Sequence, residues 1–243
     1  MRHNVVVQAS EARDMTVELR IISSMATRQL LADLVARFEA TSPQCVLVES
    51  VGGVDAAKRV KAGEAFDAVV LAANAIDDLI AAGRILAASR VDLVKSGVAI
   101  AVRVGAPRPD VGTEDAVKHA VLAARNLGYS TGPSGVQLAK LFERWGIAEE
   151  LKSRIVQAPP GVPVGALVAR GEVELGFQQL SELMNLQGID VLGPLPPSIQ
   201  ITTTFSGGVA QTSARPDAAR ALLAFMAAPE NSEIKRKNGM EAA

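Results

Sequence analysis

The sequence predicts an α/β protein of two lobes, each a mainly parallel sheet flanked by helices. Short apolar and β-branched runs alternate with amphipathic helical stretches, which is the pattern of parallel strands connected by helices. A length of 243 residues suits two small domains. Two Pro- and Gly-rich segments, residues 105–110 and 193–197, interrupt the alternation. We expect the chain to cross between the lobes near them.

The first series of elements supplies the first lobe. Its first helix is indicated by five apolar residues between positions 30 and 38 that share one face at helical spacing. Gly83 follows the third helix, as glycine commonly does at a helix end. The expected strands span residues 17–22, 46–51, 66–71 and 98–104, and the expected helices span residues 27–39, 55–61 and 75–82.

A second series of similar size follows, and then a tail. The expected helices of the second series span residues 114–124, 134–145, 164–170 and 179–185, and its strands span residues 126–129, 173–177 and a short run near Ile155. The tail contains a long β-branched strand over residues 199–212 and two helices, residues 216–227 and 229–237. Because the first lobe lacks outer helices, we expect the tail to pack on it. The expected first lobe is therefore residues 15–104 and 205–243, the inserted second lobe residues 105–204, and residues 1–14 a disordered lead.

Composition and charge exclude several classes of function. The 25 Lys and Arg against 26 Asp and Glu give a net charge of -1, and the basic residues are scattered, so no nucleic acid or anionic membrane is expected as a partner. The sequence has one cysteine, Cys45, and two histidines, His3 and His119. We therefore expect no disulfide, no metal site and no histidine-based triad. No bound cofactor is predicted.

The sequence also contains neither a secretory signal nor an apolar run of about 20 residues. We therefore expect no membrane insertion. The expected location is cytoplasmic as the sequence is written, or periplasmic if a signal peptide has been removed from it. Met15 lies just before the first strand and is an alternative translation start.

The loops after the strands of the first lobe are candidate binding segments, because ligands of open parallel sheets bind beyond the carboxyl ends of the strands. The first loop offers two serine hydroxyls before a helix, although Ser24 or Thr27 is equally explained as a helix cap. The second has two glycines whose N–H groups can approach an anion, or which simply form a tight turn. The candidate ligand-binding residues here are Ser23, Ser24, Met25, Ser50, Gly52 and Gly53.

The segment YSTGPSG, residues 129–135, is the strongest local signal in the chain. It lies between a strand and a helix and matches neither a P-loop nor a dinucleotide fingerprint. A small anion held by helix N-termini and hydroxyl donors is the ligand that such a loop favours. The candidate ligand-binding residues here are Ser130, Thr131, Gly132, Ser134 and Gly135.

Val162, Gln178 and Arg103 complete the predicted site. Val162 precedes a helix and offers an N–H group, and Gln178 lies at the end of a buried strand, where it contacts the ligand or ties the loop to the backbone. Arg103, at the expected crossing, and Arg84, after a helix end, are solvated or structural arginines unless one anchors a carboxylate in the cleft.

Several motifs resemble the molybdate-binding type of solute-binding protein of ABC transporters, which are type II periplasmic binding proteins. They are the stretch from Gly52 to Asn74 with its AFDAVVLA strand, GVAIAVRVGAPRPD from Gly97, YSTGPSG, LFERWGI from Leu141, VARGEVELGFQQLSE from Val168 and GPLPPSIQ from Gly193. The resemblance implies a ligand held between the lobes by serine hydroxyls and main-chain N–H groups, hinge closure around it, and an ABC permease as a candidate partner. By position it implies that Ser23 or Ser24 and the Ser50 turn are the serine sites of the first lobe. In the second lobe it implies N–H donors from residues 130–135 and Val162.

Two departures from that family's pattern bear on the ligand. Gln178 and Gln179 stand where the molybdate binders carry a tyrosine, and the hydroxyl-rich STGPSG replaces a tight turn. The predicted function is therefore a solute-binding protein for a small anion, either an oxyanion or an organic polycarboxylate. The alternative is a cytoplasmic isomerase of a small tricarboxylate on the same fold, similar to aconitate isomerases. It needs as its base a carboxylate, such as Glu49 or Glu182, or a hydroxyl at a helix terminus.

Overall fold

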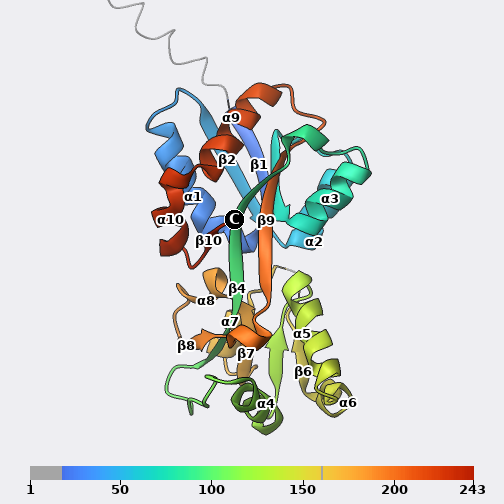
Figure 1. Ribbon diagram of the computed structural model, residues 1–243, viewed down its shortest axis with the longest axis vertical. Coiled ribbons are helices and arrows are strands. Elements are labelled where there is room, and N and C mark those ends of the chain that lie inside the picture. Colours follow the sequence, from blue (N-terminus) through green and yellow to red (C-terminus); the bar gives the residue numbers. More distant parts are fainter. Residues whose placement is uncertain (1–17, 160) are drawn as a thin grey trace, which may run out of the picture.

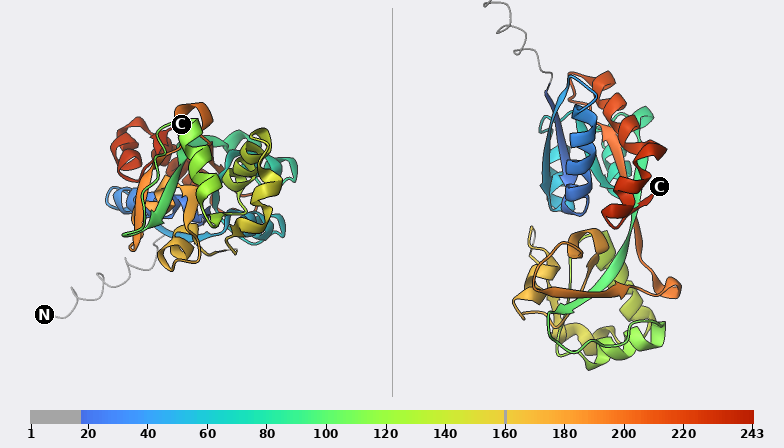
Figure 2. Two further views of the ribbon diagram at one scale, coloured as in Figure 1. Left: turned by 90° about the horizontal axis from the view of Figure 1, so that it is seen from below. Right: turned by 90° about the vertical axis from the view of Figure 1, so that its left-hand side faces the viewer.

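The computed structural model describes residues 18–159 and 161–243 and shows two lobes stacked along the long axis of the molecule (Figure 1). Two long strands, β4 (Val91–Arg103) and β9 (Thr202–Val209), link the lobes. Both strands run along one side of the molecule (Figure 2). The expected lead over residues 1–14 lies outside the described residues.

The first lobe is a mixed sheet in the order β2-β1-β3-β9-β4 with helices on both faces. Strands β1, β2 and β3 pair in parallel, whereas β9 and β4 run antiparallel to their neighbours. Helices α1, α9 and α10 cover one face, and α2 and α3 cover the other. The elements are β1 (Glu18–Ser24), α1 (Arg28–Glu39), β2 (Cys45–Val51), α2 (Gly53–Lys61), β3 (Ala68–Ala72), α3 (Ala73–Ala81), α9 (Pro216–Ala227), α10 (Ser232–Lys237) and β10 (Glu241–Ala242).

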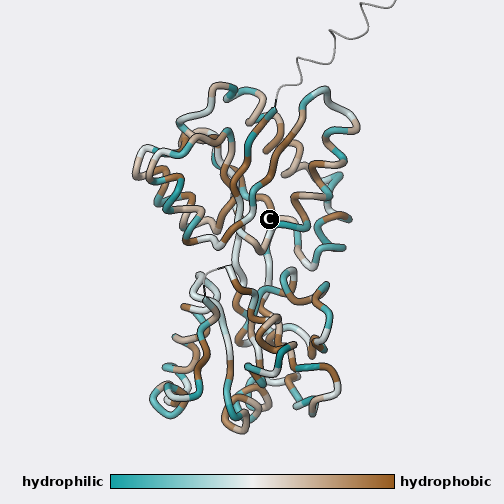
Figure 3. The backbone as a smooth tube through the Cα atoms, turned by 180° about the vertical axis from the view of Figure 1, so that it is seen from behind, coloured by the Kyte–Doolittle hydropathy of each residue, from teal (hydrophilic) through white to brown (hydrophobic). Residues whose placement is uncertain are grey.

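The strands of this lobe alternate between its two cores, since successive side chains of a strand point to opposite faces. Leu19 and Ile21 of β1 pack against α1 and α9, while Ile22 packs against α2 and α3. In β3, Val70 belongs to the first core and Leu71 to the second. Apolar residues therefore follow the strands through the middle of the lobe (Figure 3). The tail helices cover the first lobe, as predicted.

The second lobe repeats this layering on a smaller sheet, in which β5 pairs in parallel with both β6 and β7. Helices α4, α5 and α6 pack on one face, and α7 and α8 pack on the other. The elements are α4 (Glu114–Ala123), β5 (Leu127–Tyr129), α5 (Pro133–Arg144), α6 (Ala148–Leu151), β6 (Ile155–Gln157), α7 (Val164–Ala169), β7 (Leu175–Gln179), α8 (Leu180–Leu183) and β8 (Ile189–Pro194).

The crossing between the lobes differs from the expected one because β4 belongs to both sheets. Its first half, residues 91–97, pairs with β9, and its second half, residues 98–103, pairs with β7 and β8. The chain therefore enters the second lobe at Val98 and leaves it before Thr202, not at residues 104 and 205. The first half of β4 reads as a loop in the sequence because polar or glycine positions interrupt it: Asp92, Lys95, Ser96 and Gly97.

Candidate functional site

A cavity of about 660 Å³ lies between the lobes and is lined by residues of both. Its size is typical of a pocket for a small organic molecule. The carboxyl ends of the parallel strands of each lobe face it, so the loops after these strands form its walls. The cavity therefore occupies the position in which ligands of open α/β sheets bind.

In the first lobe, the loop after β1 leads into the N-terminal end of a helix at the cavity. Ser24 and Met25 line the cavity, and Ser24 also caps the short 3-10 helix that precedes α1, accepting a hydrogen bond from the Ala26 N–H at 3.3 Å. Both interpretations of Ser24, cap and cavity residue, therefore apply. Its capping bond holds the hydroxyl in place at the wall.

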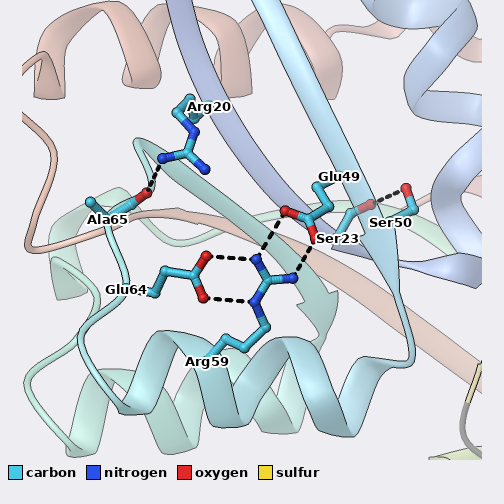
Figure 4. A network of polar contacts seen from close by, with 7 residues as sticks. All are labelled: Arg20, Ser23, Glu49, Ser50, Arg59, Glu64 and Ala65. Carbon is cyan, nitrogen blue, oxygen red and sulfur yellow. Dashed lines mark hydrogen bonds and ion pairs between the residues drawn. The ribbon is translucent and has the colours of Figure 1, made fainter.

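Ser23 and Ser50 lie behind this wall and do not line the cavity. Ser23 is fully buried, and its hydroxyl lies 2.7 Å from that of Ser50, as Figure 4 shows. The two are register partners on β1 and β2. The prediction that they contact the ligand is not supported, because each hydroxyl has the other as its partner.

The N-terminal ends of α2 and α3 complete the first-lobe wall. Gly52 and Gly53 line the cavity where α2 begins, and Asn74 lines it in the first turn of α3. No side chain caps either helix. Their first N–H groups therefore remain available to a ligand, and the positive ends of two helix dipoles face the cavity.

In the second lobe, the segment YSTGPSG forms the turn between β5 and α5, as predicted. Ser130, Thr131, Gly132 and Ser134 line the cavity at the N-terminal end of α5, and Ser134 is 8% exposed. Gly135 does not line it. A Cβ atom at Gly135 would lie 1.8 Å from the Ser130 carbonyl oxygen, so this glycine permits the tight packing of the turn.

Val162, at the loop before α7, also lines the cavity, whereas Arg103 does not. Strand β4 enters the second lobe at the cavity, where Val98 pairs with Gln179, and runs antiparallel to β7 away from it. Its last residue, Arg103, is exposed at the opposite end of the lobe. Arg84 also lies away from the cavity. The structure thus favours the solvated or structural interpretation of both arginines, and it does not support the prediction that one of them anchors the ligand.

The end of β7 and the start of α8 place three polar side chains at the cavity: Gln178, Gln179 and Glu182. Gln178 is 3% exposed, and its Oε1 accepts a hydrogen bond from the Gly165 N–H at 3.2 Å. Gln179 is 4% exposed and donates from Nε2 to the Thr203 hydroxyl at 2.9 Å, while its Oε1 has no hydrogen-bond partner among the described residues. Gln178 thus both ties the loop and lines the cavity.

Glu182 is the only acidic residue among those that line the second-lobe wall. Removal from water raises the pKa of its carboxyl group to about 7, and a hydrogen bond from the Gln178 side chain works in the opposite direction. It lies in the first turn of α8, where a helix dipole favours the ionised form. The loss of hydration therefore outweighs both stabilising effects on the carboxylate.

Glu49, the other predicted candidate for a base, has a contrasting environment outside the cavity. Arg59 contacts both Glu49 and Glu64 (Figure 4), and its Nε donates to Glu64 at 2.7 Å. Hydrogen bonding to Arg59 lowers the pKa of Glu49. A carboxylate held by a guanidinium is a weak base, so Glu49 is excluded.

Asn74 and Thr203 are among the cavity residues that were missing from the predicted site. Asn74 follows the apolar strand β3 almost directly, and a polar residue in that position is a usable sequence signal. Thr203 lies in β9 beside the crossing between the lobes. Thr203 can be recognised as a cavity residue only when the position of that crossing is known.

The two lobes touch at the rim of the cavity. The Ser181 hydroxyl of α8 donates to the Ala26 carbonyl oxygen of the first lobe at 2.9 Å. The loops at Gly52 and Gly161 also meet, since a Cβ atom at Gly52 would lie 3.7 Å from the Gly161 nitrogen. These contacts close the cavity at two points.

Two absences apply to the part of the chain that the structure describes. Within residues 18–159 and 161–243, no group of three or more His, Cys, Asp and Glu side chains is placed to hold a metal ion. No helix of these segments has the length and apolar character needed to cross a bilayer.

Solved structures share the fold across most of the chain. The periplasmic molybdate-binding protein of Azotobacter vinelandii superposes with a TM-score of 0.76 at 18% identity, over 91% of this chain and 98% of that one. The tungstate ABC transporter structure from Geobacter sulfurreducens gives a TM-score of 0.72 at 18% identity, over 90% and 98%. At these identities the likeness establishes the fold alone, which is that of type II periplasmic binding proteins.

Sequence comparison gives a relative of higher identity and a matching family. A protein of Pseudomonas sp. named aconitate isomerase is 41% identical over 186 residues, which are 75% of this chain and 70% of that protein. The family model described as "Bacterial extracellular solute-binding protein" matches residues 19–241. The chain therefore belongs to the family of bacterial extracellular solute-binding proteins.

Proposed function

We propose that this protein binds a small organic polycarboxylate in the cavity between its lobes, which close around the ligand. The observation that carries the proposal is the convergence of the N-terminal ends of α2, α3 and α5 on one cavity with hydroxyl and amide side chains from both lobes. Such donors bind carboxylates without a buried cation.

The size and length of the donor array favour an organic acid over a tetrahedral oxyanion. Donors lie along both walls, from Ser24 and Asn74 in the first lobe to Ser134 and Gln178 in the second. A tetrahedral oxyanion requires a small, enclosed cage, whereas a polycarboxylate uses several separated donors. The relative that acts on aconitate by its name is itself similar to this chain at 41% identity, which supports the same ligand class.

Closure of the lobes is proposed as a rotation about the two crossings, near Val98 and Thr202. Among the described residues, the strands β4 and β9 link the lobes there. As a member of a family described as extracellular, the protein would deliver its ligand to an ABC permease. We propose that partner and an extracytoplasmic location together.

A thermal-shift screen tests the ligand class. Molybdate, sulfate, citrate and trans-aconitate are compared at concentrations up to about 100 times the apparent Kd, where binding adds about 2.7 kcal/mol of stability. We expect citrate or trans-aconitate to raise Tm at least as much as molybdate. Strong stabilisation by molybdate with none by organic acids would contradict the proposal.

Isomerisation of a bound tricarboxylate is the second candidate function. The observation that favours it is the 41% identity to a protein named aconitate isomerase, because that name describes catalysis and not binding alone. Incubation with trans-aconitate, followed by separation of the isomers, tests it directly. If trans-aconitate is unchanged after prolonged incubation, the protein is a binding protein only.

A further inference from the structure

We propose that Glu182 is the proton-transfer residue of the cavity, removing a proton from the carbon next to a carboxylate of a bound unsaturated polycarboxylate and returning a proton elsewhere on the same ligand. This inference deepens the proposed function and rests on it. It assigns a role to the one carboxyl group that lines the second-lobe wall and has no ion-pair partner within the described residues.

The position of Glu182 provides the first argument. Its side chain lines the cavity at the start of α8, between the end of β7 and the first lobe. The adjacent Ser181 makes the hydrogen bond to Ala26 across the rim. Any ligand that fills the cavity is therefore brought against Glu182 when the lobes are in contact.

A chain of hydrogen bonds provides the second argument, because it orients the carboxyl group. The Gly165 N–H donates to Gln178 Oε1 at 3.2 Å, which leaves the Nε2 of the same amide free to donate to Glu182. The backbone donor thereby determines which way the Gln178 amide faces. Gln178 is a positioning residue in this scheme, since it acts through Glu182.

The charged groups around the cavity provide the third argument. The charged residues that line the first-lobe wall of the same cavity are Asp55, Lys58 and Lys61 of α2 and Asp78 of α3. None of them contributes to the pKa shift of Glu182, which arises from loss of hydration. A carboxylate that lines a cavity, forms no ion pair within the described residues and has a pKa of about 7 is a suitable general base near neutral pH.

The proton step balances without any further reactant. The Glu182 carboxylate takes a proton from a carbon beside a double bond and a carboxylate, and the C–H electron pair forms a new double bond. The electrons of the original double bond move toward the carboxylate conjugated with it. That carboxylate is held by the uncapped N-terminal ends of α2 or α5, which stabilise the added negative charge. Protonated Glu182, which is partly exposed to solvent, exchanges its proton with water and donates a proton to the far end of the allylic system, so the product is an isomer and Glu182 is regenerated.

The experiment follows exchange of carbon-bound protons of trans-aconitate in D2O by proton NMR, with the full-length protein. We expect exchange with the wild-type protein and a loss of at least about 100-fold in Glu182→Gln, the scale of general-base catalysis. Thermal shift with trans-aconitate should show that the variant still binds. Glu49→Gln, which removes a carboxylate outside the cavity, is the matched control and should exchange at the wild-type rate.

The pH dependence of the wild-type rate gives a second readout that needs no variant. Because the base acts in its ionised form, kcat/KM should rise with pH and level off above a pKa of about 7. Absence of exchange in a wild-type protein that binds trans-aconitate would overturn the inference and leave the proposed binding function intact. Exchange at the wild-type rate in Glu182→Gln would also overturn it. Absence of binding to any polycarboxylate would overturn the proposed function and the inference together.

Discussion

The two walls of the cavity differ in how they present polar groups. The first-lobe wall carries charges on a helix surface, where exposed Lys58 and half-buried Asp55 lie 3.8 Å apart. The second-lobe wall includes the buried neutral side chains of Ser134, Gln178 and Gln179 and one carboxyl group without an ion-pair partner in the described residues, Glu182. The first wall can adjust to a ligand, whereas the second holds its groups in place. Specific chemistry is therefore expected on the second wall.

The same contrast separates Glu49 from Glu182. Arg59 holds Glu49 in its ionised form in a hydrated environment on the first lobe. Glu182 is only partly exposed to solvent and has an amide partner in place of a guanidinium, so desolvation raises the pKa of its carboxyl group. Two residues of the same type thus differ in function because of their neighbours. Four predictions test this comparison.

The largest effect is expected from a change that breaks the second wall, Gly135→Ala. A Cβ atom there would lie 1.8 Å from the Ser130 carbonyl oxygen, so the turn before α5 must move. We expect a loss of about 3 kcal/mol in the free energy of unfolding, measured with urea.

Gly132→Ala in the same turn is the control for Gly135→Ala. Its new Cβ atom would meet nothing closer than 3.5 Å, and its φ of -75° suits alanine. It should be close to wild type in stability. Equal stability of the two variants would show that Gly135 has no packing role.

Ser134→Ala tests the claim that the second wall binds the ligand through fixed neutral donors. The lost hydroxyl is buried at the start of α5, and a hydrogen bond to a charged group contributes about 1.5–3 kcal/mol. Titration calorimetry with citrate or trans-aconitate should show affinity reduced about tenfold to a hundredfold. Ser153→Ala, on an exposed residue of the same lobe, should bind like the parent. Wild-type affinity in Ser134→Ala would place the ligand on the other wall.

Glu182→Gln and Glu49→Gln test the two carboxylates by stability, with opposite signs expected. The pKa of Glu182 is about 7 in the folded protein and near 4.5 when unfolded. Its contribution is therefore fully present below pH 4.5 and is lost as the pH rises through 7. At pH 8, Glu182→Gln should exceed the parent by about 1–3 kcal/mol, with allowance for its partial exposure to solvent.

Glu49 has a lowered pKa when folded, so its stabilisation is present above pH 4.5 and is lost as the pH falls through the lowered value. Glu49→Gln should therefore lower stability at neutral pH, less so in high salt. Urea unfolding at pH 5 and pH 8 measures both variants. A change of the same sign in both at pH 8 would remove the distinction between the two sites.

Ser181→Ala should have the smallest effect. It deletes the hydroxyl that donates to the Ala26 carbonyl oxygen across the rim, a contact of about 0.5–1.5 kcal/mol. Small-angle scattering of the ligand-free variant should show a larger radius of gyration than that of the parent, and ligand should reduce it. An unchanged radius, with or without ligand, would count against closure by movement of the lobes.

Much of the architecture follows from local patterns. The helix predicted over residues 216–227 has those bounds in the structure, and the one predicted over 114–124 differs by one residue. The missed segments include α6, β10, the first half of β4 and β8, and in the last two polar residues, glycine or proline interrupt the strand pattern. Pairing with β9 and with β4 stabilises these two segments, and a single sequence does not display such distant partners.

The candidate site was likewise predicted only in part from local patterns. The hydroxyl- and glycine-rich loops are visible in the sequence because they directly follow strands, and most of them line the cavity. Ser23, Ser50 and Gly135 have the residue types of a binding site, yet the structure gives Ser23 and Ser50 each other as partners and Gly135 a packing role. Residue type indicates what a group can do, whereas its contacts decide whether it remains free to do it.

Local sequence patterns predict the fold class, most of the helices and strands, and the loops that reach the cavity, because hydrophobic periodicity and turn residues act over short distances. The position at which the chain crosses between the lobes depends on long-range strand pairing, which places Arg103 away from the cavity. The tertiary structure also decided which of two glutamates has a pKa near neutrality. Both outcomes depend on strand pairing and on hydration, which arise when segments distant in the sequence come together.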